Sequence, residues 1–237
     1  VGSVKLDLKK MMGHKDDVVK SNVTGVEFLF KKNKITWLKG LGTIPAPGKV
    51  QVEDAKGKKE IYETDKILIA TGSDVMNLPG VEIDEKQIVS STGALELTKV
   101  PKTMVVIGGG YIGLEMGSVW SRLGTKVTVV EFLDKIVPTM DEEVGKQFHR
   151  ILGKQGIEFK LKTKVTAAKA QKSGVKLTLE PAAGGDAEEM KADVVLVSIG
   201  RRPLTDNLGL DKIGVETDPR GFIPVDEDFQ TNVEGIY

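Results

Sequence analysis

The 237-residue sequence contains no cysteine. These residues therefore supply no disulfide, no thiolate metal ligand and no redox dithiol. Histidine is almost as scarce, because only His14 and His149 occur, far apart and in helix-like contexts. Isolated histidines do not make the multidentate sites that bind transition metals, so we expect no metal site.

The chain also lacks an excess of charge and lacks long apolar runs. Its 34 basic residues balance 34 acidic residues, so we expect no nucleic-acid partner and no attraction to an anionic membrane. No apolar run reaches the roughly 18–20 residues of a membrane-spanning helix. Residues 1–10 do not have the pattern of a signal peptide. These features favour bacterial cytoplasm or the matrix of a mitochondrion.

The length and the 40% apolar content suit one large globular domain or two ordinary ones. The sequence begins with valine and stops in "NVEGIY", where an apolar segment starts. We interpret both ends as cuts through a larger protein, with processing or tagging as the alternative.

Hydrophobic patterning divides the chain into helices and strands. Residues 4–33 have a helical pattern, and residues 35–73 have the alternation and turn residues of an antiparallel meander. Residues 74–102 read as a connection with one short helix near 91–97. We then expect strands at 104–107, 126–132, 157–171, 174–181 and 192–200, and helices at 113–123 and 141–155. This order predicts an α/β fold with a parallel sheet that carries helices on both faces.

The stretch "MVVIGGGYIGLEMG" is the strongest motif in the sequence. A buried-type strand enters the glycines and a helix leaves them, which is the context that a dinucleotide-binding turn requires. Gly108 permits the sharp turn, Gly110 lets the backbone approach a pyrophosphate, and Gly113 lets the helix pack closely on the strand. The phosphates would then lie at a helix N-terminus, where free N–H groups and the helix dipole favour anions.

An acidic residue follows the turn at a suitable distance. Glu131 ends the strand "KVTVVEF" and lies 131 − 108 = 23 positions after the first glycine. A carboxylate there accepts hydrogen bonds from both ribose hydroxyls and repels a 2′-phosphate. Because no arginine stands beside it, we expect NAD rather than NADP.

Other residues near the turn have two interpretations each. Tyr111 is either a flap over the nicotinamide pocket or a packing aromatic. Glu115 shares its helix face and is either a contact to a second cofactor or an ordinary helix acid. The strand endings "KILIATGS" and "VVLVSIGRRP" bring bare backbone close to a flat ligand or simply form tight turns; the former interpretation suggests a second ligand.

The segments "ILIATGS", "VVIGGGYIGLEMGSVWSRLG", "VTVVEF", "VSIGRRP" and "GFIPVDEDFQTNVEGIY", in this order, resemble the flavin-dependent pyridine nucleotide–disulfide oxidoreductases. The resemblance covers nearly the whole chain. It implies an NAD-binding domain over residues 76–204, inserted into an FAD-binding domain to which residues 1–75 and 205–237 belong in part. Such an insertion explains why the glycine turn lies in the middle of the chain.

The resemblance also implies cofactors and the residues that bind them. The NAD-binding residues would be Gly108, Gly109, Gly110, Tyr111, Ile112, Gly113, Leu114, Glu115, Glu131, Val165 and Gly200. The FAD-binding residues would be Gly42, Thr71, Gly72 and Ser73.

The implied activity is the reoxidation of protein-bound dihydrolipoamide, with electrons passing through a disulfide and FAD to NAD+. The implied partners are lipoyl-bearing proteins of 2-oxo acid dehydrogenase complexes, and the implied parent is a homodimer. The family's redox cysteines and its histidine–glutamate pair are not among these residues, so we expect no catalytic residue here and no activity of the chain alone. The alternatives are the NAD-binding module of a reductase for another disulfide or for mercuric ion, and a non-catalytic NAD-binding or interaction module.

Overall fold

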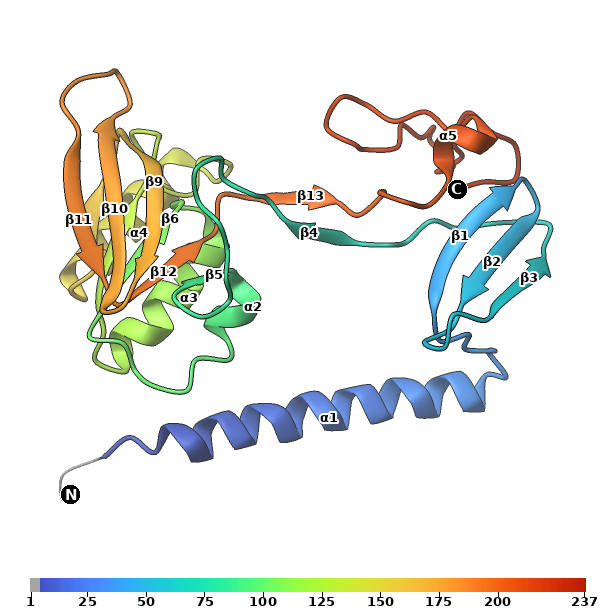
Figure 1. Cartoon of the computed structure of the whole chain (residues 1–237), viewed down its shortest axis with the longest axis horizontal. Coiled ribbons are helices and arrows are strands. Elements are labelled where there is room, and N and C mark those ends of the chain that lie inside the picture. The colour runs from blue at the N-terminus through green and yellow to red at the C-terminus, as the bar shows by residue number, and fades with distance from the viewer. Residues whose placement is uncertain (1–4) are drawn as a thin grey trace. The chain divides into compact units, whose positions relative to one another are not determined.

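A computed structural model describes residues 5–237, and the chain divides into two compact units (Figure 1). Unit 1 contains residues 75–200 together with the chain up to Asp17, and unit 2 contains residues 18–74 and 201–237. The chain passes between the units once after Asp17 and twice more at a short two-stranded ribbon. Its strands are β4 (Ser73–Val75) and β13 (Arg201–Pro203).

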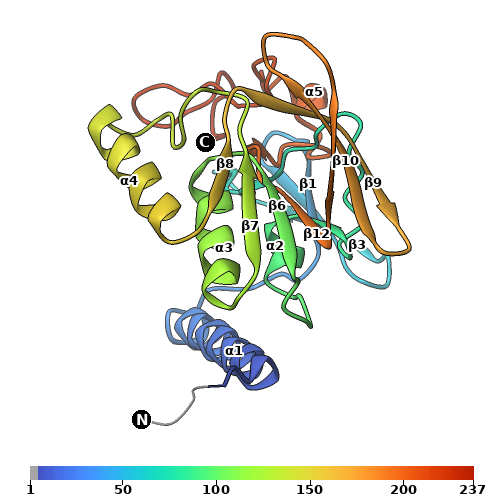
Figure 2. The same cartoon turned by 90° about the vertical axis from the view of Figure 1, so that its left-hand side faces the viewer.

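Unit 1 is built on a five-stranded sheet in the order β5-β12-β6-β7-β8, and all of its pairs are parallel. The strands are β5 (Ile88–Val89), β6 (Thr103–Ile107), β7 (Lys126–Val130), β8 (Glu158–Lys160) and β12 (Val194–Val197). Figure 2 shows β8, β7, β6 and β12 side by side. All four residues of β12 are buried, as a strand covered on both faces requires. The α/β class predicted from the sequence is confirmed.

One face of this sheet is covered by helices. They are α2 (Ser91–Ala94), α3 (Tyr111–Arg122) and α4 (Glu142–Lys154). Leu114 and Trp120 of α3 and Leu152 of α4 share a buried core with Val106 and Val127 of the sheet. The carboxylate of Asp141 caps α4 by accepting hydrogen bonds from two backbone N–H groups of its first turn, which is where the sequence placed the start of this helix.

The other face is covered by a second sheet, so the prediction of helices on both faces is wrong. Strands β9 (Thr163–Gln171), β10 (Gly174–Pro181) and β11 (Glu188–Ala192) follow β8 and precede β12 in the sequence. They form a separate antiparallel meander. Alternate residues of the meander, such as Leu177 and Leu179, pack against Val105 and Ile107. Because an alternating strand presents a continuous apolar face, a meander buries this side of the sheet as a helix would.

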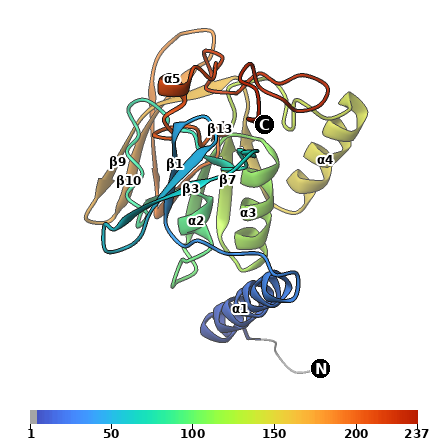
Figure 3. The same ribbon diagram turned by 90° about the vertical axis from the view of Figure 1, so that its right-hand side faces the viewer.

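Unit 2 contains the predicted antiparallel meander, which is confirmed (Figure 3). Its strands are β1 (Leu41–Ala46), β2 (Lys49–Glu53) and β3 (Lys59–Glu63), and its short helix α5 spans Leu210–Ile213. Its small hydrophobic core includes Ile44, Ile67, Ile213 and Ile236.

Helix α1 (Leu8–Lys32) confirms most of the first predicted helix, and the boundary between the units falls within it, after Asp17. The predicted start of this helix at Val4 lies outside the described residues. No helix within residues 5–237 combines the length and apolar character needed to cross a membrane.

The strand expected over residues 66–73 does not form. Ile67 makes only an isolated bridge to Ile236, and the N–H of Ile69 donates to the carbonyl of Tyr237 at 2.7 Å. Leu68 is 73% exposed. Among the described residues this segment pairs only with residues 235–237, over too short a stretch to form a strand.

The close packing of α3 on β6 gives a testable prediction. A Cβ at Gly113 would lie 2.5 Å from the Ser198 hydroxyl oxygen, 2.6 Å from the Gly108 carbonyl and 2.8 Å from Val106. We expect Gly113→Ala to lower the free energy of unfolding by about 1–3 kcal/mol because the helix must move outward. Gly153→Ala is the matched control, since its Cβ meets nothing within 4 Å and alanine favours a helix by up to about 1 kcal/mol. Urea denaturation of both variants distinguishes crowding from helix propensity, and equal stability of the two would contradict the packing argument.

Candidate dinucleotide-binding site

The glycine turn joins the end of β6 to the start of α3. Gly108 has φ +105°, and a Cβ there would lie 2.5 Å from the backbone carbonyl oxygen of Ser198. Its N–H donates to the carbonyl of Val130 at 2.9 Å. Glycine is therefore required by both the backbone conformation and the available space.

Gly110 is the N-cap residue of α3, and it leaves open space in front of the helix. Its backbone is extended, with φ −76° and ψ 174°, and no side chain caps the helix there. A Cβ at Gly110 would meet nothing within 4 Å. Unsatisfied N–H groups at the start of a helix bind anions, so this end of α3 has the properties of a phosphate site.

Glu131 is buried, with only 8% of the residue exposed, and its carboxylate lies against the turn. One of its oxygens accepts the N–H of Gly109 at 2.5 Å, and the other accepts the N–H of Leu133 at 2.8 Å. Each carboxylate oxygen has a further lone pair, so these bonds leave acceptor capacity for a ligand. The contact between Glu131 and the turn itself did not follow from the sequence motif.

A pocket of about 290 Å³ opens at the carboxyl ends of β6 and β7, where ligands bind in α/β sheets. Three residues predicted to bind NAD line it: Gly108, Glu131 and Val165. The pocket is completed by residues that the sequence did not single out: Leu78, Ile107, Val130, Phe132, Thr163, Lys164 and Ile199. Phe132, Lys164 and Ile199 are direct sequence neighbours of predicted residues, whereas nothing in the sequence pointed to Leu78.

The remaining residues assigned to NAD occupy varied environments. Tyr111 is 63% exposed, so it does not pack in the core, and Glu115 is exposed one helical turn further along. Ile112 is half-buried, and the side chain of Leu114 is fully buried in the core of unit 1. Gly200 is exposed, with φ +137°, and it follows Ile199 of the pocket wall.

The residues assigned to FAD lie in unit 2 on separate elements. Gly42 lies on β1 opposite Val52. The Thr71 hydroxyl donates to the carbonyl of Leu204 at 2.6 Å, and Gly72 has φ +74°. The Ser73 hydroxyl accepts a hydrogen bond from the Arg201 guanidinium at 2.7 Å. Thr71, Gly72 and Ser73 are exposed and lie where the β4–β13 ribbon begins.

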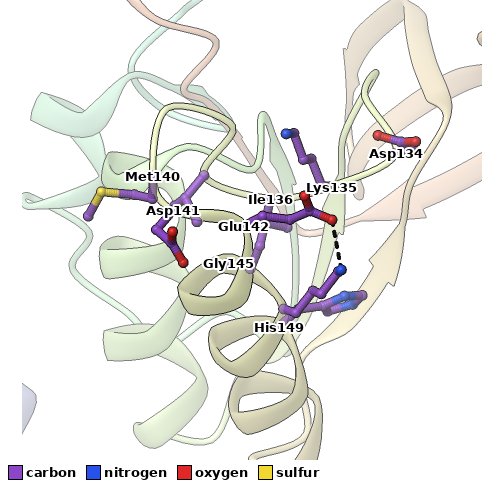
Figure 4. A pocket seen from close by; sticks show the side chains of 10 residues that line it. Asp134, Lys135, Ile136, Met140, Asp141, Glu142, Gly145 and His149 are labelled. Atoms are coloured by element: carbon purple, nitrogen blue, oxygen red, sulfur yellow. Dashed lines mark ion pairs between the residues drawn. The ribbon is translucent and has the colours of Figure 1, made fainter.

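A second pocket of about 200 Å³ lies between the loop after β7 and the start of α4 (Figure 4). Its charged lining includes Lys135, Glu142 and Lys146, and the last two form an ion pair at 2.7 Å. The hydrogen bond from Lys146, and then the charges of Lys146 and Lys135, lower the pKa of Glu142. His149 also lines this pocket, with its ring edge-on to Phe159 at 4.4 Å between centroids. Within residues 5–237, no cluster of three histidine or acidic side chains is arranged to hold a metal ion.

The fold and the turn define the class of the protein: a dinucleotide-binding α/β protein with a second unit joined through three chain crossings. Residues 3–237 match the family model described as pyridine nucleotide-disulphide oxidoreductase, and the chain belongs to that family. It is 58% identical over 237 residues to the mitochondrial dihydrolipoyl dehydrogenase of Pisum sativum and 60% identical over 237 residues to the leghemoglobin reductase of Vigna unguiculata.

Both matches include the whole of this chain but only 47% and 45% of those relatives, so the chain spans about half the length of the curated relatives it matches. Among solved structures, LpdA from Mycobacterium tuberculosis matches with a TM-score of 0.90 and 23% identity. That match covers 100% of this chain and 52% of LpdA. At this identity the likeness establishes the fold.

Proposed function

We propose that the chain is the central, NAD-binding part of a dihydrolipoyl dehydrogenase, which reoxidises protein-bound dihydrolipoamide with NAD+. The observation that carries the proposal is the hydrogen bond between the Glu131 carboxylate and the glycine turn, beside the open helix N-terminus at Gly110 and a pocket lined by Gly108 and Glu131. The identity of 58% to the pea dihydrolipoyl dehydrogenase over the whole chain supports the same activity.

In this proposal residues 76–204 form the NAD-binding domain. The open N-terminus of α3 would hold the pyrophosphate, and the remaining lone pairs of Glu131 would accept hydrogen bonds from the hydroxyls of the adenosine ribose. When bound, the nicotinamide and the flavin would supply the hydride-transfer chemistry, and the residues of this chain would orient the nicotinamide. Val165 and Ile199 give the pocket apolar walls that exclude water from one side of the ligand.

Residues 1–75 and 205–237 contribute to an FAD-binding domain. Gly42, Thr71, Gly72 and Ser73 are its flavin contacts, and the exposed glycine backbone at Gly72 lets a flat ligand approach. Since these 237 residues contain no cysteine, the redox disulfide of the reaction comes from other residues of the protein. This part of the chain therefore orients the nicotinamide and does not carry the thiol chemistry.

The partners follow from the same proposal. Lipoyl-bearing proteins of 2-oxo acid dehydrogenase complexes supply the dihydrolipoyl group, and the parent enzyme is a homodimer. Several relatives are named as mitochondrial, including dihydrolipoyl dehydrogenase 1 of Arabidopsis thaliana at 56% identity. We place this protein in the same compartment.

The experiment is a steady-state assay of the full-length protein with dihydrolipoamide and either NAD+ or NADP+. We expect turnover with NAD+ and at least roughly 100-fold lower kcat/KM with NADP+, which corresponds to about 2.8 kcal/mol. No reduction of either nucleotide by a flavin-loaded protein would refute the proposed activity. The match to the cowpea leghemoglobin reductase favours a second candidate substrate. With NADH as the electron donor, faster reduction of leghemoglobin than of lipoamide would assign that role instead.

A further inference from the structure

We propose that the segment after β7 clamps the glycine turn and sets the direction of the peptide that binds pyrophosphate. This inference rests on the proposed NAD site. The clamp consists of three residues around Gly109, namely Glu131, Ile136 and Val137. The Glu131 carboxylate, which binds the ribose in the proposed function, would then have a second role, because it also positions the turn that holds the phosphates.

Both polar backbone groups of Gly109 are held by the clamp. Its N–H donates to the carboxylate of Glu131 at 2.5 Å, and its carbonyl accepts the N–H of Val137 at 2.9 Å. A carboxylate acceptor makes the first bond charge-assisted and therefore stronger than a neutral one. Gly109 is thus fixed from two sides by residues more than twenty positions away in the sequence.

The bond to Val137 determines where the next N–H points. The described chain contains no cis peptide bond, and in a planar trans peptide the carbonyl and the following N–H point in opposite directions. With the Gly109 carbonyl directed at Val137, the N–H of Gly110 points away from the clamp. Gly110 is the residue around which a Cβ would find open space. The clamp therefore turns this N–H toward the proposed phosphate position.

The clamp is anchored in the core and leaves little space around Gly109. Ile136 is 2% exposed and belongs to the helix-side core of unit 1. A Cβ at Gly109 would lie 3.2 Å from Ile136 and 3.2 Å from the Glu131 carboxylate. Val137 has φ +40°, a conformation that β-branched residues rarely adopt, and burial holds it in that conformation.

The two roles of Glu131 can be separated with a ligand that lacks the ribose contacts. The probe is an NAD analogue whose adenosine ribose has neither the 2′- nor the 3′-hydroxyl. Calorimetric titration of the full-length, flavin-loaded protein measures the dissociation constants of NAD and of this analogue for wild type, Glu131→Ala and Glu131→Gln. Asp134→Ala is the matched control, because it removes the same charge from an exposed position on the same loop without touching Gly109.

We expect Glu131→Ala to bind the analogue roughly tenfold more weakly than wild type does. The analogue makes no ribose contact with Glu131, so this loss comes from the missing bond to Gly109. Glu131→Gln keeps one acceptor oxygen, so its loss should be intermediate, and it decides the question if the alanine variant does not fold. Asp134→Ala should bind both ligands within about twofold of wild type.

Equal affinity of wild type, Glu131→Ala and Glu131→Gln for the analogue would overturn the clamp and leave Glu131 with a ribose role only. A loss of similar size in Asp134→Ala would overturn it too, because general electrostatics would then explain the effect. Failure of wild type to bind NAD at all would instead refute the proposed function, so the two failures are distinguishable.

Discussion

A valine at Gly110 should weaken NAD binding by at least roughly 100-fold, or about 2.8 kcal/mol, while leaving the fold intact. The side chain would project into the open space at the N-cap of α3, where nothing lies within 4 Å of the added Cβ. Because the native backbone there is extended, with φ −76°, valine adopts it without strain. The loss would therefore come from occupation of the pyrophosphate position.

Calorimetry measures the affinity of this variant, and circular dichroism with thermal unfolding measures its fold. Gly153→Val is a suitable control, since it also adds a side chain in open space but on α4. We expect normal NAD affinity in the control. Normal affinity in Gly110→Val would show that the cofactor does not lie at this turn.

Discrimination between NAD and NADP should depend on Glu131. In the wild type, a 2′-phosphate would have to approach the carboxylate of a buried residue, Glu131, held in place by two backbone N–H groups. Replacement by alanine removes the repulsion and two charge-assisted bonds to the ribose, each of about 1.5–3 kcal/mol at most. We expect the ratio of NADP to NAD dissociation constants to fall by roughly 100-fold, mainly because NAD binds less tightly.

Titration of both nucleotides by protein fluorescence measures this ratio. Asp134→Ala serves again as the control for net charge, and its ratio should equal that of the wild type. If the native protein binds NADP as tightly as NAD, the role given to Glu131 is wrong.

The elements around the glycine turn were predictable because local chemistry determines them. The strand–turn–helix around Gly108, Gly110 and Gly113 follows from a buried apolar run, a glycine spacing and a helical pattern that agree with one another. The first turn of α4 was predictable for the same reason, since Asp141 is a favourable N-cap residue.

The covering of the second face of the sheet was harder to predict. An alternating strand and an amphipathic helix both offer one apolar face, and the sequence does not state which element lies on which side of a sheet. The residues of β9 and β10 were predicted as strands, but their position against Val105 and Ile107 depends on tertiary packing. The apolar "KILIA" run was misleading for a related reason, because the sequence does not show how short a stretch it pairs with.

The hydrogen bonds within the site were not predictable from the motif. Spacing placed Glu131 near a ribose, but its bond to Gly109 and the bond from Val137 depend on how the loop after β7 folds back. Loop conformations of this kind are set by distant contacts, here the burial of Ile136. Leu78 joins the pocket from a connection whose sequence has no binding signature.

Hydrogen exchange of the full-length protein with and without NAD measures whether the dinucleotide binds at the glycine turn. We expect NAD to increase protection of amides in residues 108–115 and 131–137, with no increase in the meander β1–β3 of unit 2. Increased protection confined to other segments, at an NAD concentration that saturates binding, would contradict the placement of the dinucleotide at this turn.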